Sequence, residues 1–258
     1  MVNSVFDISG RKAIVTGGTR GLGKQIAEAY CEAGCEVVFI GSNKTRLEQT
    51  VAENVAKGYK AYAVVADLTD MDQCDRAYKE ALEKLGGVVD IMVPCAGIQY
   101  RHSIEEFPFE EFERLQKLNV WHCYKMAQLA IQTMLAQENR TCKGKIILIG
   151  SSGCFSAGHN ISAYATSKGA ILNMAKGMAE NVASRGINVN VLCPGYFGTE
   201  ILNSMDPEKR AHLGDKIPAR RIGNDRDLIG PCIFMASDAS DYMDGTSLLI
   251  DGGLIAIH

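Results

Sequence analysis

The sequence predicts an α/β fold, a doubly wound parallel sheet of about seven strands with helices on both faces. Short runs rich in valine and isoleucine alternate along the whole chain with longer segments of helical spacing. The short runs are continuously apolar, as expected of strands that are covered on both faces. This alternation indicates right-handed β-α-β units, which place successive strands parallel in one sheet.

Seven apolar runs are the expected strands, and five longer segments are the clearest expected helices. The strands are Lys12–Thr16, Glu36–Ile40, Ala61–Val65, Ile91–Pro94, Lys145–Gly150, Asn188–Cys193 and Ser247–Ile250. The helices are Gly23–Ala33, Lys44–Lys57, Met71–Leu85, Glu110–Ala136 and Ala163–Ser184. No repeat, low-complexity tract or linker interrupts the alternation. We therefore expect residues 1–258 to form one domain, although ~150 residues per domain would allow two.

Composition and charge exclude several classes of protein. With 258 residues, of which 47% are hydrophobic, the chain can bury a full core, and this excludes disorder and a small disulfide-stapled scaffold. The net charge of −3 gives no electrostatic reason to expect nucleic acid or an anionic membrane as a partner. No apolar run approaches the ~18 residues of a membrane span.

The cysteines and the first residues indicate the compartment. The chain has 9 cysteines, an odd number without a C-x-x-C pair, which favours neither a disulfide framework nor a zinc site. The first residues lack the apolar core of a signal peptide. We therefore expect a cytoplasmic protein that holds no metal.

A glycine-rich turn follows the first expected strand. The run Gly17-Gly18-Thr19-Arg20-Gly21-Leu22-Gly23 leads directly into a helix that we expect to begin near Lys24. Glycines allow a tight turn and a close approach of the backbone to a pyrophosphate, whose charge the helix N-terminus favours. This turn predicts a dinucleotide site in the first β-α unit. An ordinary strand-to-helix turn is the alternative.

The spacing Thr-Gly-x-x-x-Gly-x-Gly, formed by Thr16, Gly17, Gly21 and Gly23, resembles the fingerprint of the short-chain dehydrogenase/reductase family. Further motifs of the family follow, so that the resemblance extends from residue 11 to residue 253. It implies a Rossmann-type fold. It also implies an NAD(P)-dependent oxidoreductase that transfers a hydride between a nicotinamide and a ketone or secondary alcohol.

Tyr164 and Lys168 match the Tyr-x-x-x-Lys motif of this family. Residues four apart on a helix share a face, so the phenol and the ammonium can point at one substrate. A free tyrosine has a pKa of ~10, and a nearby cation favours the phenolate, which suits acid–base work near neutrality. The resemblance implies that Tyr164 exchanges a proton with the substrate oxygen and that Lys168 also holds the nicotinamide ribose. A surface i,i+4 pair is the alternative.

Two further catalytic positions follow from the resemblance. Ser151 lies 13 residues before Tyr164, at the end of an expected strand, and would hydrogen-bond the substrate carbonyl. Ser152 is the alternative to it. Asn119 matches the family's helical asparagine, which implies a bound water that links Lys168 to solvent.

The resemblance assigns the cofactor contacts to residues near the carboxyl ends of the expected strands. They are Gly17, Thr19, Arg20, Gly21, Leu22, Gly23, Ser42, Asn43, Lys44, Asp67, Leu68, Cys95, Ala96, Gly97, Tyr164, Lys168, Pro194, Gly195, Phe197 and Thr199. One position departs from the family pattern, because Cys95 stands where an asparagine is usual. We expect this change to cost stability or cofactor affinity without abolishing activity.

The end of the second strand favours NADP(H) over NAD(H). Members of the family that use NAD carry an acidic residue at this position to hold the ribose hydroxyls, whereas this chain has Gly41. Arg20 and Lys44, together with Ser42, could contact a 2′-phosphate. The alternative is that Arg20 and Lys44 are solvated surface charges.

Several segments resemble the gluconate 5-dehydrogenase and 2-deoxy-gluconate 3-dehydrogenase branch of the family. They are Ala96–His102, Glu106–Pro108, Pro194–Glu200, Ile217–Arg221 and Asp241–Met243. The resemblance implies a sugar-acid substrate, and an arginine fork suits a carboxylate. The candidate substrate contacts are Gln99, Arg101, His102, Ser151 and His159. The alternative is that Arg101 and His102 lie on the rim without a contact to substrate.

Other functions remain open from the sequence. The loop Gly153–Ile161 shows little likeness to that branch, and its Phe155 and Ile161 would suit an apolar ketone such as a steroid or a 3-oxoacyl thioester. A catalytically silent dinucleotide-binding protein is a third possibility. The segment at about 199–217 has mixed charge and is expected to be a substrate lid, with a plain surface helix pair as the alternative. Two long helices carry more apolar and small residues than a sheet face needs, and the resemblance implies that they pair across a two-fold axis. We therefore expect a homotetramer or a homodimer.

Overall fold

Seven parallel strands form one sheet in the computed structural model, which describes residues 2–138, 143–198 and 206–257. The strands are β1 (Lys12–Thr16), β2 (Glu36–Gly41), β3 (Ala61–Val65), β4 (Ile91–Pro94), β5 (Gly144–Ile149), β6 (Ile187–Pro194) and β7 (Ser247–Ile250). Their order is β3-β2-β1-β4-β5-β6-β7. The order reverses beside β1, and such a switch point opens a crevice at the carboxyl ends of the strands. The predicted fold class is confirmed.

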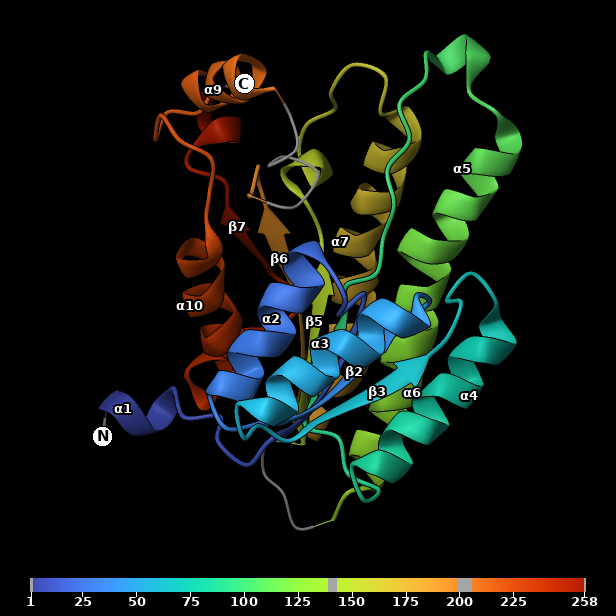
Figure 1. Cartoon of the computed structure of the whole chain (residues 1–258), viewed down its shortest axis with the longest axis vertical. Helices are drawn as coiled ribbons and strands as arrows, with labels where there is room; N and C mark the ends of the chain where they lie inside the picture. The colour runs from blue at the N-terminus through green and yellow to red at the C-terminus, as the bar shows by residue number, and fades with distance from the viewer. Residues whose placement is uncertain (1, 139–142, 199–205, 258) are drawn as a thin grey trace.

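Helices cover both faces of this sheet (Figure 1). The longer helices are α2 (Gly21–Glu32), α3 (Lys44–Ala56), α4 (Met71–Lys84), α5 (Phe109–Gln116), α6 (His122–Ala136), α7 (Ser162–Val182), α9 (Pro207–Asp215) and α10 (Asp225–Ala236). Shorter turns are α1 (Val2–Val5), η1 (Ile104–Glu106), η2 (Lys117–Trp121), η3 (Ser152–Cys154), η4 (Ala183–Arg185), η5 (Asp238–Ser240) and η6 (Leu254–Ile257). No helix in the described part of the chain is long and apolar enough to cross a membrane.

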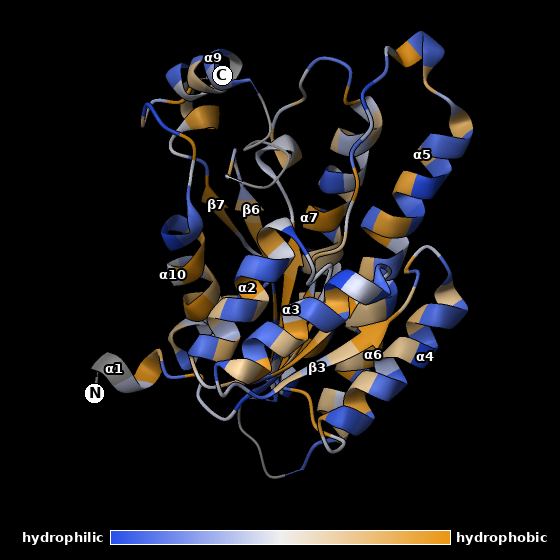
Figure 2. Ribbon diagram, in the orientation of Figure 1, coloured by the Kyte–Doolittle hydropathy of each residue, from blue (hydrophilic) through white to orange (hydrophobic). Residues whose placement is uncertain are grey.

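The two faces of the sheet bury separate cores, because successive side chains of a strand point to opposite sides. Ile14 of β1 packs in the core beneath α4, α6 and α7. Its neighbours Ala13 and Val15 pack in the other core, beneath α2, α3 and α10. Figure 2 shows the strands as mainly hydrophobic, whereas the helices also carry many hydrophilic residues.

Two helical segments differ from their sequence expectations. The helix expected over Glu110–Ala136 is interrupted, because η2 is a π-helical segment between α5 and α6. Segments of this kind are common at functional sites, and Asn119 lies in the middle of this one. The helix α10 was not expected, since Pro231 lies inside it. Its start is fixed by Asn224, whose side chain accepts a hydrogen bond from Arg226 N.

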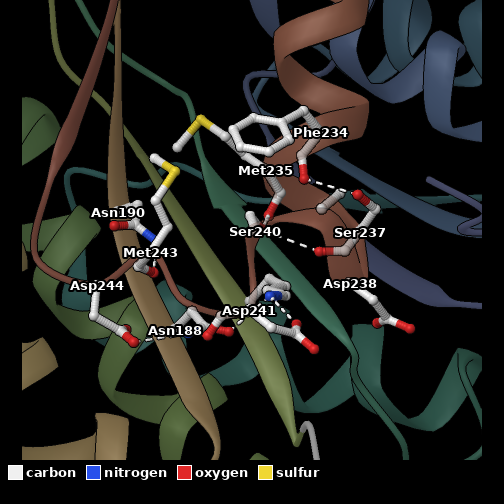
Figure 3. Close-up of polar contacts among 12 residues, drawn as sticks. Asn188, Asn190, Phe234, Met235, Ser237, Asp238, Ser240, Asp241, Met243 and Asp244 are labelled. Carbon is white, nitrogen blue, oxygen red and sulfur yellow. Dashed lines mark hydrogen bonds and ion pairs between the residues drawn. The ribbon is translucent and has the colours of Figure 1, made fainter. Parts of the chain in front are cut away.

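A polar network ties the amino ends of β5 and β6 to the segment before β7 (Figure 3). The buried Lys145 Nζ donates to Asn188 Oδ1 and to Asp241 Oδ1, each at 2.7 Å. Asn188 Nδ2 in turn donates to the Asp241 carbonyl at 3.0 Å and to Asp244 Oδ2 at 2.8 Å. A buried ammonium needs such partners to offset its desolvation. The network holds the sheet end that lies opposite the functional site.

Candidate active site

The turn after β1 is shaped so that only glycine fits at two of its positions. A Cβ on Gly23 would lie 2.5 Å from the Gly17 carbonyl oxygen. A Cβ on Gly17, whose φ is +69°, would lie 2.9 Å from Ala96 Cα. The Gly17 N–H donates to the Ile40 carbonyl at 2.8 Å, which fixes the turn against β2. The backbone is therefore open to close approach, as the phosphates of a dinucleotide require.

The helix that follows this turn presents its N-terminus to the same space. Arg20 is its N-cap, in extended conformation and without a hydrogen bond from its side chain to the helix. The first backbone N–H groups of a helix lack partners inside the helix and favour an anion. The residues present at this turn fit a dinucleotide pyrophosphate.

The last residue of β2 is Gly41, the position at which a carboxylate would favour NAD(H) over NADP(H). Gly41 is buried, and a Cβ there would lie 3.0 Å from Thr19 Cγ2. Ser42, Asn43 and Lys44 follow it and are exposed. Asn43 caps α3 by accepting from Arg46 N at 2.9 Å, so this oxygen is already used within the protein.

Asp67 and Leu68 follow β3 at the same edge of the sheet. Asp67 is exposed, and its Oδ1 accepts from both the N–H and the hydroxyl of Thr69, at 3.0 and 2.8 Å. Leu68 is buried in the core beneath α4. Asp67 is therefore accessible to a ligand at this edge of the sheet, whereas the Leu68 side chain packs in the core.

The segment after β4 is clamped at two of its residues. The Ala96 N–H donates to Thr16 Oγ1 at 3.0 Å. The Ile98 N–H donates to Asn119 Oδ1, and Asn119 Nδ2 donates to the Ile98 carbonyl, both at 2.9 Å. Cys95 precedes this clamp, and burial raises the pKa of its thiol to about 11, so it stays protonated.

Three of the expected catalytic residues gather at the ends of β5 and α7. Ser151 Oγ accepts from Gly153 N at 3.0 Å. A Cβ on Gly153 would lie 3.4 Å from Ser151 Oγ and 3.6 Å from Tyr164 Cε1, so the serine hydroxyl and the tyrosine ring border the same small space. Lys168 Nζ lies 5.7 Å from the Tyr164 ring centroid and donates to the Ile149 carbonyl at 2.7 Å.

The charge of Lys168 is preserved although the residue is buried. Burial disfavours the ammonium, but the electrostatic effect of Tyr164 and of neighbouring thiols outweighs it, and the pKa of Lys168 lies above its ordinary value. Lys168 therefore places a positive charge beside the Tyr164 ring. Asn119 is fully buried, and its Nδ2 also donates to Ser167 Oγ at 3.1 Å, one residue before Lys168.

Cys154 is a part of this site that sequence reasoning missed. The Ser151 N–H donates to its Sγ at 3.3 Å, and the thiol donates to the Lys168 carbonyl at 3.0 Å. It thus joins the serine turn to the helix that carries the tyrosine and the lysine. The capping-box spacing, in which a residue three positions after a serine N-cap returns to its backbone, is the signal that could have identified it.

The expected substrate residues, apart from Ser151, lie in the segments after β4 and after Ser151. Gln99, Arg101 and His159 are exposed. His102 has protein partners already, because its Nε2 lies 2.7 Å from Glu111 Oε2 and its backbone N–H donates to the Asn160 carbonyl at 3.1 Å. Its role in this structure is therefore to hold two loops together.

The segment after β6 is described only in part. Pro194 and Gly195 end the strand, and a Cβ on Gly195 would lie 2.7 Å from Asp251 Cβ. The Phe197 side chain is buried in the core with α10. Thr199, and with it residues 199–205 of the expected lid, lies outside the described residues. The described part, from 206 to 217, contains α9 on the side of the carboxyl ends of β6 and β7 (Figure 1).

Groups of three or more His, Cys, Asp or Glu side chains placed to hold a metal ion are absent from the described ranges. The backbone, hydroxyl and ammonium groups described above are of the kinds that suit a dinucleotide and an acid–base reaction.

Known proteins resemble this chain over its whole length. The short chain dehydrogenase family matches residues 11–210. The 2-dehydro-3-deoxy-D-gluconate 5-dehydrogenase of Escherichia coli is 34% identical over 99% of this chain and 100% of its own length. The gluconate 5-dehydrogenase of Gluconobacter oxydans is 35% identical over 97% of this chain and 96% of its own.

A solved structure shows the same arrangement. The gluconate 5-dehydrogenase of Burkholderia cenocepacia, crystallised in complex with NADP and tartrate, superposes with a TM-score of 0.90 at 34% identity. The alignment covers 99% of each chain. Together with the family match and the glycine turn, these similarities identify the family of the chain. It belongs to the short-chain dehydrogenase family and is an NAD(P)-dependent dehydrogenase or reductase that acts on CH–OH groups.

Proposed function

We propose that this enzyme interconverts a secondary hydroxyl and a ketone on a sugar acid of the gluconate and 5-keto-gluconate type, with NADP(H) as its cofactor. The observation that carries the reaction type is that Ser151, Tyr164 and Lys168 lie together after β5, on the same sheet as the glycine turn after β1. The substrate class is supported by the full-length likeness to two enzymes named for gluconate derivatives. The exposed Arg101 could pair with the carboxylate.

The residues divide the work of this reaction among them. When bound, the nicotinamide supplies the hydride for reduction or accepts it in oxidation. The Tyr164 hydroxyl gives a proton to the substrate oxygen in reduction and takes it back in oxidation. The Ser151 hydroxyl donates a hydrogen bond to the same oxygen and stabilises its developing charge. Lys168 keeps a positive charge beside Tyr164, and Asn119 fixes Ile98 and Ser167 around it.

A panel of substrates tests this proposal. We expect purified enzyme to oxidise NADPH in the presence of 5-keto-gluconate and to act more slowly with NADH. Steroid ketones and a 3-oxoacyl thioester belong in the same panel, because Phe155, 46% exposed, offers an apolar surface in the loop after Ser151. If the enzyme turned over only those compounds, its substrate class would be an apolar ketone and not a sugar acid. Cofactor binding without turnover of any compound would favour the silent dinucleotide-binding protein.

Gly41→Asp is expected to reverse the cofactor preference. The new carboxylate would face the 2′-phosphate of NADP(H), and like charges in contact cost several kcal/mol, so NADPH affinity should fall ~10-fold or more relative to NADH. The Cβ also approaches Thr19 Cγ2 to 3.0 Å, which crowds the turn for any side chain. Gly41→Asn is the matched control, because it adds the same bulk without the charge. Equal NADPH to NADH affinity ratios in the two variants, measured by fluorescence titration, would contradict this assignment.

We further propose a homotetramer, or else a homodimer, in a reducing compartment such as the cytoplasm. Between α6 and α7 lies a groove of about 540 Å³ that includes Tyr124, Ile131, Met174 and Met178. Tyr124 is 51% exposed, and polar side chains such as Gln128, Asn173 and Arg185 share the groove with the apolar ones. Light scattering should give four times, or twice, the mass of one chain. The eight described cysteines are free thiols, which supports the compartment.

A further inference from the structure

A buried histidine connects the glycine turn to the segment after β4. His122 begins α6, directly after the π-helical segment η2, and is fully buried. Its Nε2 lies 2.9 Å from Thr16 Oγ1, and its Nδ1 is hydrogen-bonded to the Leu118 carbonyl. The side-chain hydrogen bonds of His122 and Thr16 go to residues other than Tyr164, Lys168 and Ser151, so the proposed mechanism leaves both residues without a role.

The partners of His122 determine which nitrogen carries the proton. A carbonyl oxygen can only accept, so Nδ1 must be the N–H of the neutral ring and Nε2 must be the acceptor. The Thr16 hydroxyl therefore donates to Nε2, and its oxygen accepts from the Ala96 N–H at 3.0 Å. The result is a directed relay from the Ala96 N–H through Thr16 and His122 to the Leu118 carbonyl. Burial lowers the pKa of His122 to about 4, so the ring stays neutral and the direction is preserved at physiological pH.

The relay holds both sides of the close contact between Gly17 and Ala96. Thr16 immediately precedes Gly17, and Ala96 is the residue against which Gly17 packs, since a Cβ on Gly17 would meet Ala96 Cα at 2.9 Å. A shift of Thr16 or Ala96 would therefore displace the turn. Asn119, three residues before His122, fixes Ile98 in the same segment.

We propose that His122 is a positioning residue for the dinucleotide, which holds the glycine turn and the Ala96–Ile98 segment in the spacing that the cofactor needs. The proposal rests on the proposed cofactor site at that turn. It concerns cofactor affinity and leaves the acid–base step to Tyr164. The effect on cofactor affinity comes from Nε2, which accepts from Thr16, whereas the bond from Nδ1 to the Leu118 carbonyl stabilises the start of α6.

Two substitutions separate these nitrogens. In His122→Gln the amide reaches the position of Nε2 and can accept from Thr16, whereas in His122→Asn it reaches only the position of Nδ1. We expect His122→Asn to weaken NADPH binding ~10-fold, the worth of one hydrogen bond, and His122→Gln to stay within about threefold of the wild type. Both variants lose one buried hydrogen bond and should show similar falls in melting temperature. A merely structural role would give the two variants the same NADPH affinity.

Thr16 provides a second pair that does not depend on the folding of the His122 variants. Thr16→Val removes the hydroxyl and should weaken NADPH binding at least as much as His122→Asn, whereas Thr16→Ser should restore it. Fluorescence titration measures the NADPH affinity of each variant without a substrate. With an identified substrate, kcat at saturating NADPH should change less than KM for NADPH. Wild type that binds neither NADPH nor NADH would overturn the proposed function. Wild type that binds NADPH, with equal affinities in the Asn and Gln variants or in the Val and Ser variants, would overturn this inference alone.

Discussion

Tyr164→Phe is expected to lower kcat by ~10²–10⁴-fold, the usual contribution of a positioned general acid or base. The substitution removes one hydroxyl and leaves the ring. The packing of the ring against Gly153, where an added Cβ would lie 3.6 Å from Tyr164 Cε1, is therefore unchanged. Lys168 keeps its bond to the Ile149 carbonyl. NADPH affinity should therefore change little, and the loss should appear in kcat. Steady-state rates and a fluorescence titration measure the two quantities separately.

Tyr242→Phe is the matched control for this experiment. Tyr242 is fully exposed, between α10 and β7, and the same loss of a hydroxyl there should leave kcat unchanged. Tyr164→Phe that keeps more than about half of the wild-type kcat would show that another group moves the proton. The Ser151 hydroxyl, which borders the same space, would then be the residue to replace.

The strands could be predicted from sequence because parallel strands buried on both faces are continuous apolar runs. Ile91–Pro94 has the same bounds in the structure, and Lys145–Gly150 differs only by beginning and ending one residue earlier. The helices of the structure differ from the expected helices at two places. A helical spacing continues through residues 117–121, so nothing in the pattern shows that five residues there are wound as a π-helix. Pro231 argues against a helix, yet α10 forms around it because both of its ends and its apolar face are held by the fold.

The site was predictable where its residues keep fixed spacings along the chain. The glycine turn and the Tyr164–Lys168 pair are of this kind, because four residues on a helix or seven in a turn determine the geometry. Thr16 and His122 are 106 residues apart in sequence, and the pairing of β1 with β4 together with the packing of α6 against β4 brings them together. Their roles follow from hydrogen-bond partners that no local pattern encodes.

Acid should destabilise this protein through His122 over a definite range of pH. Burial is the main cause of its lowered pKa, about 4 against an ordinary 6.5, and the charge of Lys168 adds to it. Between these values the unfolded chain binds a proton that the folded chain does not. The unfolding free energy therefore falls as the pH drops from 6.5, and this loss levels off near pH 4. The difference corresponds to about 3 kcal/mol from this one residue.

His122→Gln tests this assignment, because glutamine does not titrate. Urea unfolding at pH 7, 6, 5 and 4.5, at one protein concentration, should show the wild type losing more stability than the variant across that range. The curves should run parallel below about pH 4. There the acidic groups take over, since Arg221 lowers the pKa of Asp227 to about 2 and that contribution is lost only as the carboxylate protonates. Parallel curves between pH 6.5 and 4.5 would show that His122 titrates with an ordinary pKa in the folded protein. Burial would then not keep the ring neutral in acid, and Nε2 would accept from Thr16 only above about pH 6.5.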